Sequence, residues 1–183
     1  MRIIGGEFRS RKLKSPSSGL TRPTKDRVRE AVFSMIAGRI CNSRVLDLFA
    51  GSGAYGLEAL SRGAASCVFV DNDMECEGVM SENIEKLKIS EKAKVMRKDA
   101  GKYIEELGKN GEKFDIIFID PPYSLGASRN ILIMIERYDI LSDSGLLIAE
   151  HSSKESIPEG QGDVSIYKQK SYGITSISIF IKK

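Results

Sequence analysis

Three glycines in the segment LDLFAGSGAYG, residues 46–56, constrain the fold more than any other feature of this chain. They follow the apolar run RVLDLF and precede a helical pattern, so Gly51, Gly53 and Gly56 match G-x-G-x-x-G between a strand and a helix. This arrangement is typical of the first strand-to-helix turn in a doubly wound α/β sheet. Because glycine has no side chain, such a turn also lets a ligand approach the backbone closely.

From residue 44 onward, short apolar runs alternate with segments of helical periodicity. The expected strands are 44–49, 67–71, 94–99, 114–120 and 145–151. The expected helices between them are 52–63, 74–88, 101–111 and 128–141. The tail alternates apolar and polar residues on both sides of Tyr172 and Gly173, which predicts a closing antiparallel hairpin. We therefore expect a Rossmann-like α/β fold with a mostly parallel seven-stranded sheet and helices on both faces.

Residues 1–22 are predicted to form a basic N-terminal extension, separate from the alternating body at 23–183. Within it, RIIGGEF and RKLKS predict a small β-ribbon, and Pro23 predicts the start of a helix. Residues 1–44 hold 11 Lys and Arg against 3 Asp and Glu, whereas the rest hold 17 against 22. A basic arm on a mildly acidic body indicates an anionic partner, and its interleaved Phe8, glycines and prolines favour nucleic acid over a merely solvated tail.

The composition excludes several other classes. The 183 residues suit one compact domain with a small appendage, and no stretch of about 18 apolar residues occurs. Cys41, Cys67 and Cys76 have neither zinc-site spacing nor the even count of a disulfide framework, so we expect reduced thiols. His151 is the only histidine, which argues against a His-based triad or metal site. The expectation is a cytoplasmic monomer without a membrane or metal partner.

Four acidic residues fall at the ends of the first four predicted strands. They are Asp47, Asp71, Asp99 and Asp120. Ligands of such sheets bind outside the carboxyl ends of the strands, so these side chains are expected to face one crevice. Any one of them could instead cap a helix, but the set of four favours a binding site.

Asp47 stands four residues before the first glycine and bears on the choice of cofactor. A carboxylate there would repel a pyrophosphate and attract the amino group or sulfonium of S-adenosylmethionine. Asp71 is placed for ribose hydroxyls, and Asp99 with Ala100 for adenine. We therefore favour S-adenosylmethionine over NAD, and a structural turn without a ligand remains the alternative. The expected cofactor residues are Asp47, Phe49, Ala50, Gly51, Ser52, Gly53, Asp71, Asn72, Asp99 and Ala100.

The sequence DPPY at 120–123 ends the fourth predicted strand and suggests the chemistry. An amine attached to an aromatic ring is a weak nucleophile, and two hydrogen-bond acceptors can make its nitrogen more tetrahedral. The Asp120 carboxylate and the Pro121 carbonyl can be those acceptors, because proline fixes the backbone direction. Tyr123 can lie against the base, and we expect Pro122 to belong to the same catalytic corner. The alternative is a proline-terminated strand whose Asp120 caps the next helix.

Together these motifs resemble class I S-adenosylmethionine-dependent methyltransferases that modify exocyclic amines of nucleic-acid bases. MRIIGGEFRSRKL, TRPTKDRVREAVF, the glycine loop and DPPY are similar to the bacterial 16S ribosomal RNA guanine-N2 methyltransferase D family over nearly the whole chain. The resemblance implies a class I methyltransferase fold and methylation of N2 of a guanine, by family expectation guanine 966, in the small ribosomal subunit or its assembly intermediate. It also implies an RNA-binding side at Arg2, Arg9, Arg11, Lys12, Arg22, Thr24 and Arg29.

Two departures and three rival functions accompany this resemblance. Tyr55 stands where the family usually has leucine, and Asp71 where it usually has glutamate. An adenine-N6 DNA methyltransferase could also use DPPY, although this chain has little room for a target-recognition segment. A non-catalytic RNA-binding module would not need Asp47, Asp71 and Asp120 intact, and an NAD-binding protein would not need DPPY.

Overall fold

The computed structural model describes residues 1–17, 23–121 and 127–183. Within these ranges, eight strands form one sheet in the order β3-β2-β1-β4-β5-β8-β7-β6. The strands are β1 Arg44–Leu48, β2 Ser66–Asp71, β3 Ala93–Arg97, β4 Phe114–Ile119, β5 Leu141–Ser152, β6 Gly160–Gln161, β7 Val164–Tyr172 and β8 Thr175–Lys182. The helices are α1 Pro23–Met35, α2 Ala54–Ser61, α3 Met74–Leu87, α4 Ala100–Lys109 and α5 Ala127–Arg137, with 3₁₀ turns η1 Ala37–Arg39 and η2 Ser90–Lys92.

The sheet confirms the expected topology. Strands β1 to β5 pair in parallel, and β8 joins β5 antiparallel before β7 closes the hairpin. The short β6 adds an eighth strand beside β7, one more than we expected. The fifth helix ends at Arg137, earlier than predicted, because Asp139 has a φ of 51° that a helix cannot continue through.

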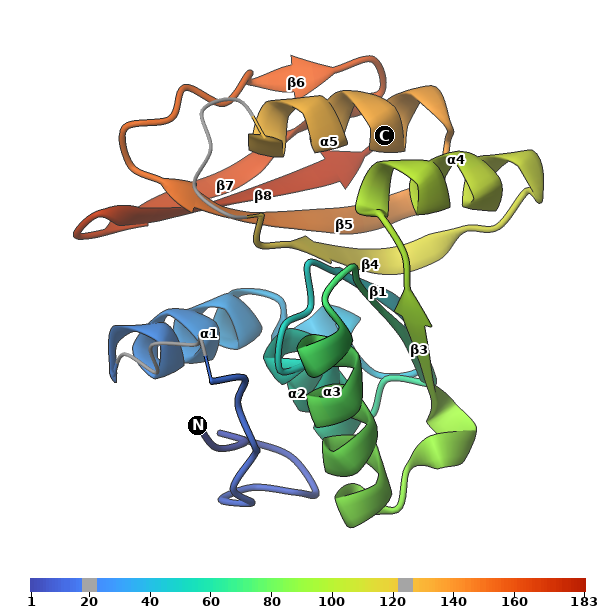
Figure 1. The fold of residues 1–183 in the computed structure, drawn as a ribbon. Coiled ribbons are helices and arrows are strands. Elements are labelled where there is room, and N and C mark those ends of the chain that lie inside the picture. The colour runs from blue at the N-terminus through green and yellow to red at the C-terminus, as the bar shows by residue number, and fades with distance from the viewer. Residues whose placement is uncertain (18–22, 122–126) are drawn as a thin grey trace.

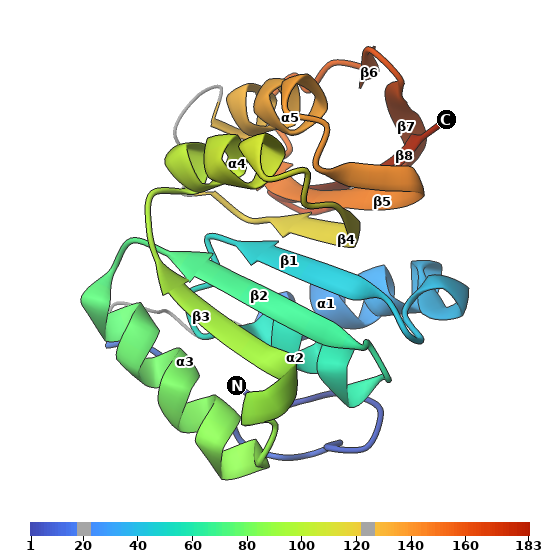
Figure 2. The same cartoon turned by 90° about the vertical axis from the view of Figure 1, so that its right-hand side faces the viewer.

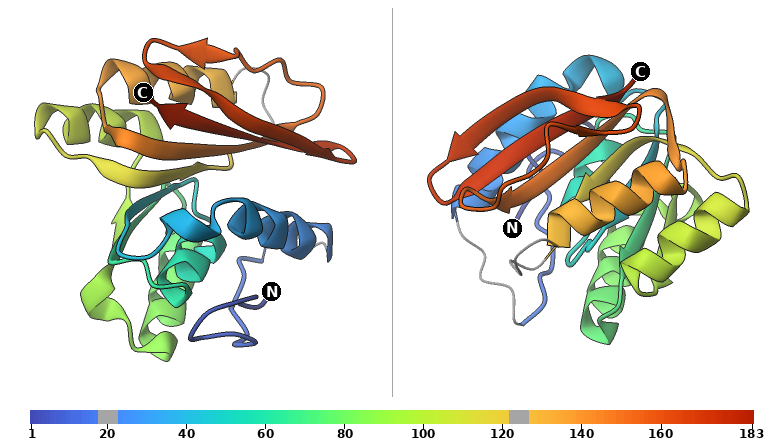
Figure 3. Two further views of the ribbon diagram at one scale, coloured as in Figure 1. Left: turned by 180° about the vertical axis from the view of Figure 1, so that it is seen from behind. Right: turned by 90° about the horizontal axis from the view of Figure 1, so that it is seen from above.

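Helices cover both faces of the sheet (Figures 1 and 2). Helices α1, α2 and α3 lie on one face, where the apolar cluster includes Val45 and Phe118. Helices α4 and α5 cover the other face, where the cluster includes Leu46 and Ile117. Neighbouring strand residues thus point into different layers, as the period of two requires. The N-terminus lies near α1 and α2, far from the C-terminus at the end of β8 (Figure 3).

The predicted N-terminal β-ribbon is much shorter than expected. In the described part of this segment it consists of one isolated antiparallel bridge between Arg2 and Lys12, beside which the Ile3 N–H donates to the Arg11 carbonyl at 3.0 Å. Between these two short segments the backbone packs against α2: a Cβ added to Gly6, whose φ is 77°, would lie 1.9 Å from the Ser61 carbonyl oxygen. Among the described helices, none is long and apolar enough to span a bilayer.

Candidate active site

The glycine loop connects β1 to α2 through backbone conformations that favour glycine. Gly51 has a φ of 54° and Gly53 a φ of 77°, in the left-handed region. A Cβ added to Gly51 would meet nothing within 4 Å, so the backbone there faces open space. At Gly56, by contrast, a Cβ would lie 2.3 Å from the Phe69 ring, so this glycine permits close packing of α2 on β2. The loop therefore combines a tight turn with an accessible backbone.

Asp47 is a buried carboxylate beneath this loop. Its Oδ2 accepts a hydrogen bond from the Gly56 N–H at 2.8 Å. Burial raises its pKa to about 8, the Gly56 N–H opposes this rise, and the nearby Asp120 and Asp71 carboxylates add to it. A cation beside Asp47 would favour the ionised carboxylate and lower its pKa. The group is thus suited to a positively charged ligand.

Asp71 and Asp99 both have structural partners in addition to any ligand role. Asp71 accepts from the Gly51 N–H at 2.8 Å through Oδ2 and from the Asp73 N–H at 3.0 Å through Oδ1. Asp71 therefore stabilises the glycine turn, in addition to the role toward the ribose that the sequence suggested. Asp99 is the N-cap of α4 and accepts from the Lys102 N–H at 3.0 Å. Each carboxylate oxygen has a second lone pair, so these contacts are compatible with ligand binding.

Asp120 and Pro121 directly follow β4, at the same edge of the sheet as Asp47. Asp120 is half-buried and Pro121 is buried. The Asp120 carboxylate lies close enough to raise the pKa of both Asp47 and Tyr55. The two acids are brought together because β1 and β4 are neighbouring parallel strands. Pro122 and Tyr123, which we also expected to be catalytic, lie outside the described residues.

Glu150 lies at this edge of the sheet and was missed in the sequence, whereas Tyr55 on α2 was noted only as a departure from the family. The Tyr55 hydroxyl donates to Glu150 Oε2 at 2.8 Å. The Tyr55 ring stacks on Phe118 with centroids 5.0 Å apart and an interplanar angle of 25°. Burial, with Glu150 and Asp120 nearby, raises the Tyr55 pKa well above its usual range. Glu150 could have been found in the sequence, because it lies near the end of the fifth predicted strand, just as the other acids lie at the ends of theirs.

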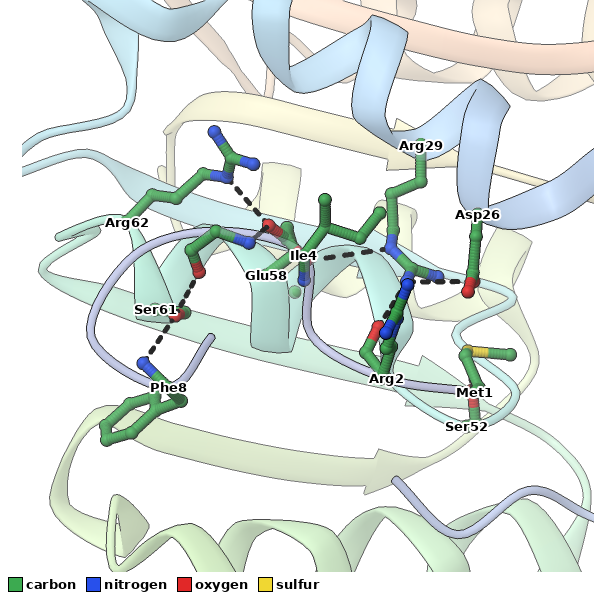
Figure 4. Close-up of polar contacts among 12 residues, drawn as sticks. Met1, Arg2, Ile4, Phe8, Asp26, Arg29, Ser52, Glu58, Ser61 and Arg62 are labelled. Carbon is green, nitrogen blue, oxygen red and sulfur yellow. Dashed lines mark hydrogen bonds and ion pairs between the residues drawn. The ribbon is translucent and has the colours of Figure 1, made fainter. Parts of the chain in front are cut away.

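Residues 1–17, which we call the arm, are anchored to α2 by Glu58 (Figure 4). Glu58 is fully buried, and its carboxylate accepts the Ile4 N–H at 2.7 Å and the Gly5 N–H at 2.8 Å. Arg62 Nε also donates to it at 2.8 Å. One turn later, Ser61 Oγ donates to the Gly5 carbonyl at 2.6 Å. The arm is therefore fixed to the helix that follows the glycine loop.

Arg29 does not lie on an RNA-facing surface, contrary to our expectation. It is only 2% exposed, and its Nη2 donates to the Arg2 carbonyl at 2.6 Å and to Asp26 at 3.1 Å. Its Nε lies 3.7 Å from Glu58 (Figure 4). The other described residues of that set are exposed: Arg2, Arg9, Arg11 and Lys12. Arg22 lies outside the described residues, as does the side chain of Thr24.

A second contact joins the arm to the glycine loop itself. Asn83 on α3 is 1% exposed, and its Oδ1 accepts the Lys14 N–H at 2.8 Å. Its Nδ2 donates to the Lys14 carbonyl and to the Ser52 carbonyl, both at 3.1 Å. Ser52 also lies 3.5 Å, Oγ to Sδ, from Met1. The buried Asn83 amide thus links the arm to the loop, and Met1 adds a second contact.

His151 and the three cysteines have the following surroundings. His151 is buried, with Nε2 2.9 Å from Ser178 Oγ and a pKa lowered by burial. The three cysteines are free thiols, and burial raises the pKa of Cys67 and Cys76. Cys41 is exposed, whereas His151, Cys67 and Cys76 are buried in the packed interior.

The family model described as "Conserved hypothetical protein 95" matches residues 1–181. The chain belongs to this family. Among its relatives, the "Putative rRNA methyltransferase YlbH" of Bacillus subtilis is 38% identical over 183 residues, covering 100% of both chains. The "Ribosomal RNA small subunit methyltransferase D" of Escherichia coli strain K12 is 35% identical over 180 residues, covering 98% of this chain and 89% of the relative.

Family membership extends to the three-dimensional structure. The solved structure "Putative methyltransferase yhhF from Escherichia coli" matches with a TM-score of 0.90 and 34% identity, covering 100% of this chain and 98% of that one. The Rossmann-like methyltransferase fold is therefore confirmed. The resemblance to the methyltransferase D family, seen first in the arm and the two motifs, is confirmed as well.

Proposed function

We propose that the chain transfers a methyl group from S-adenosylmethionine to the exocyclic N2 amine of a guanine in 16S ribosomal RNA, with guanine 966 as the family's expected position. One observation carries this proposal: Asp47 under the glycine loop and Asp120 with Pro121 meet at one sheet edge, on the neighbouring strands β1 and β4. A site for a cationic cofactor thus adjoins a corner built from hydrogen-bond acceptors. The names of the relatives supply the class of RNA.

The described residues fit this cofactor. Burial without a counter-ion raises the pKa of Asp47 to about 8, and a sulfonium or ammonium group of the cofactor would provide that counter-ion. The open backbone at Gly51 accepts the methionine part, and Asp71 and Asn72 at the end of β2 serve the ribose. Asp99 and Ala100 serve the adenine, while Phe49, Ala50, Ser52 and Gly53 complete the loop. When bound, the cofactor supplies a methyl group that is already strongly electrophilic.

The protein's part in the transfer is mainly positioning. Asp120 and the Pro121 carbonyl accept the two N–H groups of the guanine amine, which directs the nitrogen lone pair toward the methyl group. The N–C bond would form as the sulfur–methyl bond breaks and its electron pair returns to sulfur, and the extra proton on the nitrogen would then pass to Asp120 or to water. Pro122 and Tyr123 complete this corner in the proposal, with the tyrosine ring against the base. The base must be unstacked to enter.

RNA binding is assigned to residues 1–22 and methyl transfer to residues 23–183. Arg2, Arg9, Arg11 and Lys12 are exposed and can contact phosphates, with Arg22 and Thr24 next along the chain. Because Glu58 and Asn83 fix the arm to the body, this surface is preformed. The enzyme works in the cytoplasm as a monomer on the small subunit or its assembly intermediate.

The test is methyl transfer from tritium-labelled cofactor to three acceptors: under-methylated small subunits, naked small-subunit RNA and duplex DNA. Digestion to nucleosides should place the label in N2-methylguanosine from the ribosomal RNA. Label in N6-methyladenine from DNA would instead support the DNA methyltransferase. An Asp120→Ala control should lose turnover while it still binds S-adenosylhomocysteine, and surviving turnover would refute the amine-holding role.

A further inference from the structure

Glu150 lies beside Asp120 at the candidate active site. Strands β4 and β5 run in parallel with Ile119 opposite Ala149, so Asp120 and Glu150 follow at the next position on neighbouring strands. Such strands lie about 4.8 Å apart. Ile148 packs in the cluster under α2, and Glu150, two residues later, points to the same face. The two acids therefore share one face of one sheet edge.

The Glu150 carboxylate is held in place. Glu150 is 4% exposed, and the Tyr55 hydroxyl donates to its Oε2 at 2.8 Å. The Tyr55 ring is in turn fixed by stacking on Phe118, two residues before Asp120. A hydroxyl bond to one oxygen leaves the other carboxylate oxygen as an acceptor. The orientation of this second acid is thus set by the same packing that supports Asp120.

A second carboxylate beside the amine-holding acid matches guanine and opposes adenine. In guanine, the exocyclic N2 amine is adjacent to N1–H, which is a donor. In adenine, the exocyclic N6 amine is adjacent to N1, which carries a lone pair and is an acceptor. A carboxylate next to Asp120 can accept the guanine N1–H, whereas it repels the adenine lone pair. Sites that hydrogen-bond a substrate group reject analogues without it, because the buried polar partner is left unpaired.

We propose that Glu150, oriented by Tyr55, accepts the N1–H of the target base and selects guanine over bases that lack this proton. The inference rests on the proposed function, since it assigns a specificity residue to the same site. It also gives a role to Tyr55, the residue that stands where the family usually has leucine. The competing explanation is that Glu150 serves only as the buried partner of the Tyr55 hydroxyl.

The experiment compares two acceptor RNAs in reconstituted small subunits. One carries guanosine at the target position, and the other carries 2-aminopurine riboside, which keeps the 2-amine but has no N1–H. We expect the wild-type enzyme to favour guanosine by about 100-fold or more in kcat/KM. In Glu150→Gln, whose amide can donate to the bare N1 and can still accept from Tyr55, the preference should fall to about 10-fold or less.

The preference, and not the rate alone, separates selection from a structural role. A Tyr55→Phe variant keeps the ring that stacks on Phe118 but removes the hydroxyl that orients Glu150, so it should also lower the preference, whereas a purely structural pair would slow both acceptors equally. S-adenosylhomocysteine affinity, measured by calorimetry, should stay within about twofold in Glu150→Gln. If the wild-type enzyme is active and Glu150→Gln keeps the same preference, the inference about Glu150 is refuted and the proposed function is not. A wild-type enzyme that methylates neither RNA would overturn the proposed function, and this inference with it.

Discussion

Replacing Glu58 with alanine should destabilise the protein strongly, because this buried carboxylate joins the arm to α2. The substitution removes the acceptor of the Ile4 and Gly5 N–H groups, at 2.7 and 2.8 Å. It also removes the acid 3.7 Å from the Arg29 Nε, whose side chain is only 3% exposed. Removing one partner of a buried ion pair costs about 3–5 kcal/mol, since the remaining charge is left buried without compensation.

The structure favours the lower end of that range. Arg29 keeps Asp26 at 3.1 Å and the Arg2 carbonyl at 2.6 Å, so part of its charge stays compensated. Arg62, whose side chain is 23% exposed, can turn toward water. We therefore expect Glu58→Ala to lower the free energy of unfolding by about 3 kcal/mol. Urea denaturation followed by circular dichroism measures this loss, and trypsin should cleave the native arm faster at Arg9 and Arg11.

Glu82→Ala is the matched control. Glu82 also pairs with the arm, at 2.7 Å from Lys14 Nζ, but both side chains are more than half exposed. Exposed pairs contribute little, so this variant should unfold close to the wild type. A loss below about 1 kcal/mol in Glu58→Ala, or equal losses in the two variants, would refute the argument from burial.

Three further predictions concern the site and the arm. The pKa of Asp47 is raised from 3.8 to about 8, so the folded apo protein binds this proton more tightly than the unfolded chain, and the free energy of unfolding should fall between about pH 4 and 8. In urea titrations, Asp47→Asn should therefore stabilise the protein more at pH 8 than at pH 5, and an equal gain at both would contradict the burial of the charge. Asn83→Asp loses the amide donor to the Ser52 carbonyl, so calorimetry should find S-adenosylhomocysteine binding about tenfold weaker, whereas unchanged binding would exclude support of the loop. Replacing Arg9 and Arg11 with alanine should reduce the salt slope of RNA binding by about 2, and an unaltered slope would remove them from the interface.

Patterns local in sequence predicted most of the fold. The glycine loop and the alternation of strands and helices depend on residues close together in the chain, and they fixed the parallel sheet and its hairpin correctly. The arm was harder, because its conformation depends on α2. Gly5 and Gly6 look like part of a strand, yet they pack against Ser61, more than 50 residues later. No local pattern contains that contact.

The same limit applied to individual side chains of the site. Arg29 looked like one more basic residue among the first 44, and its burial against the Arg2 carbonyl, Asp26 and Glu58 makes it structural. Conversely, Glu150 lies near the end of a predicted strand, as Asp47 and Asp71 do. Its orientation depends on a hydrogen bond from Tyr55, which is 95 residues away in sequence. Charge and spacing identify candidates for a site. Burial and long-range partners decide which of them support the fold and which remain available to a ligand.

The docking of the arm also has a consequence for how the chain is made. The groups that fix its first 14 residues lie on α2 and α3, as far along as Asn83, so they emerge from the ribosome much later. Synthesis proceeds at about 5–20 residues per second, so the basic arm stays undocked for several seconds. During that time its arginines are exposed beside the ribosome's own RNA. This interval ends when α3 has folded and Asn83 can bind the arm. By then the cofactor loop, which precedes α3 in the chain, has already been synthesised.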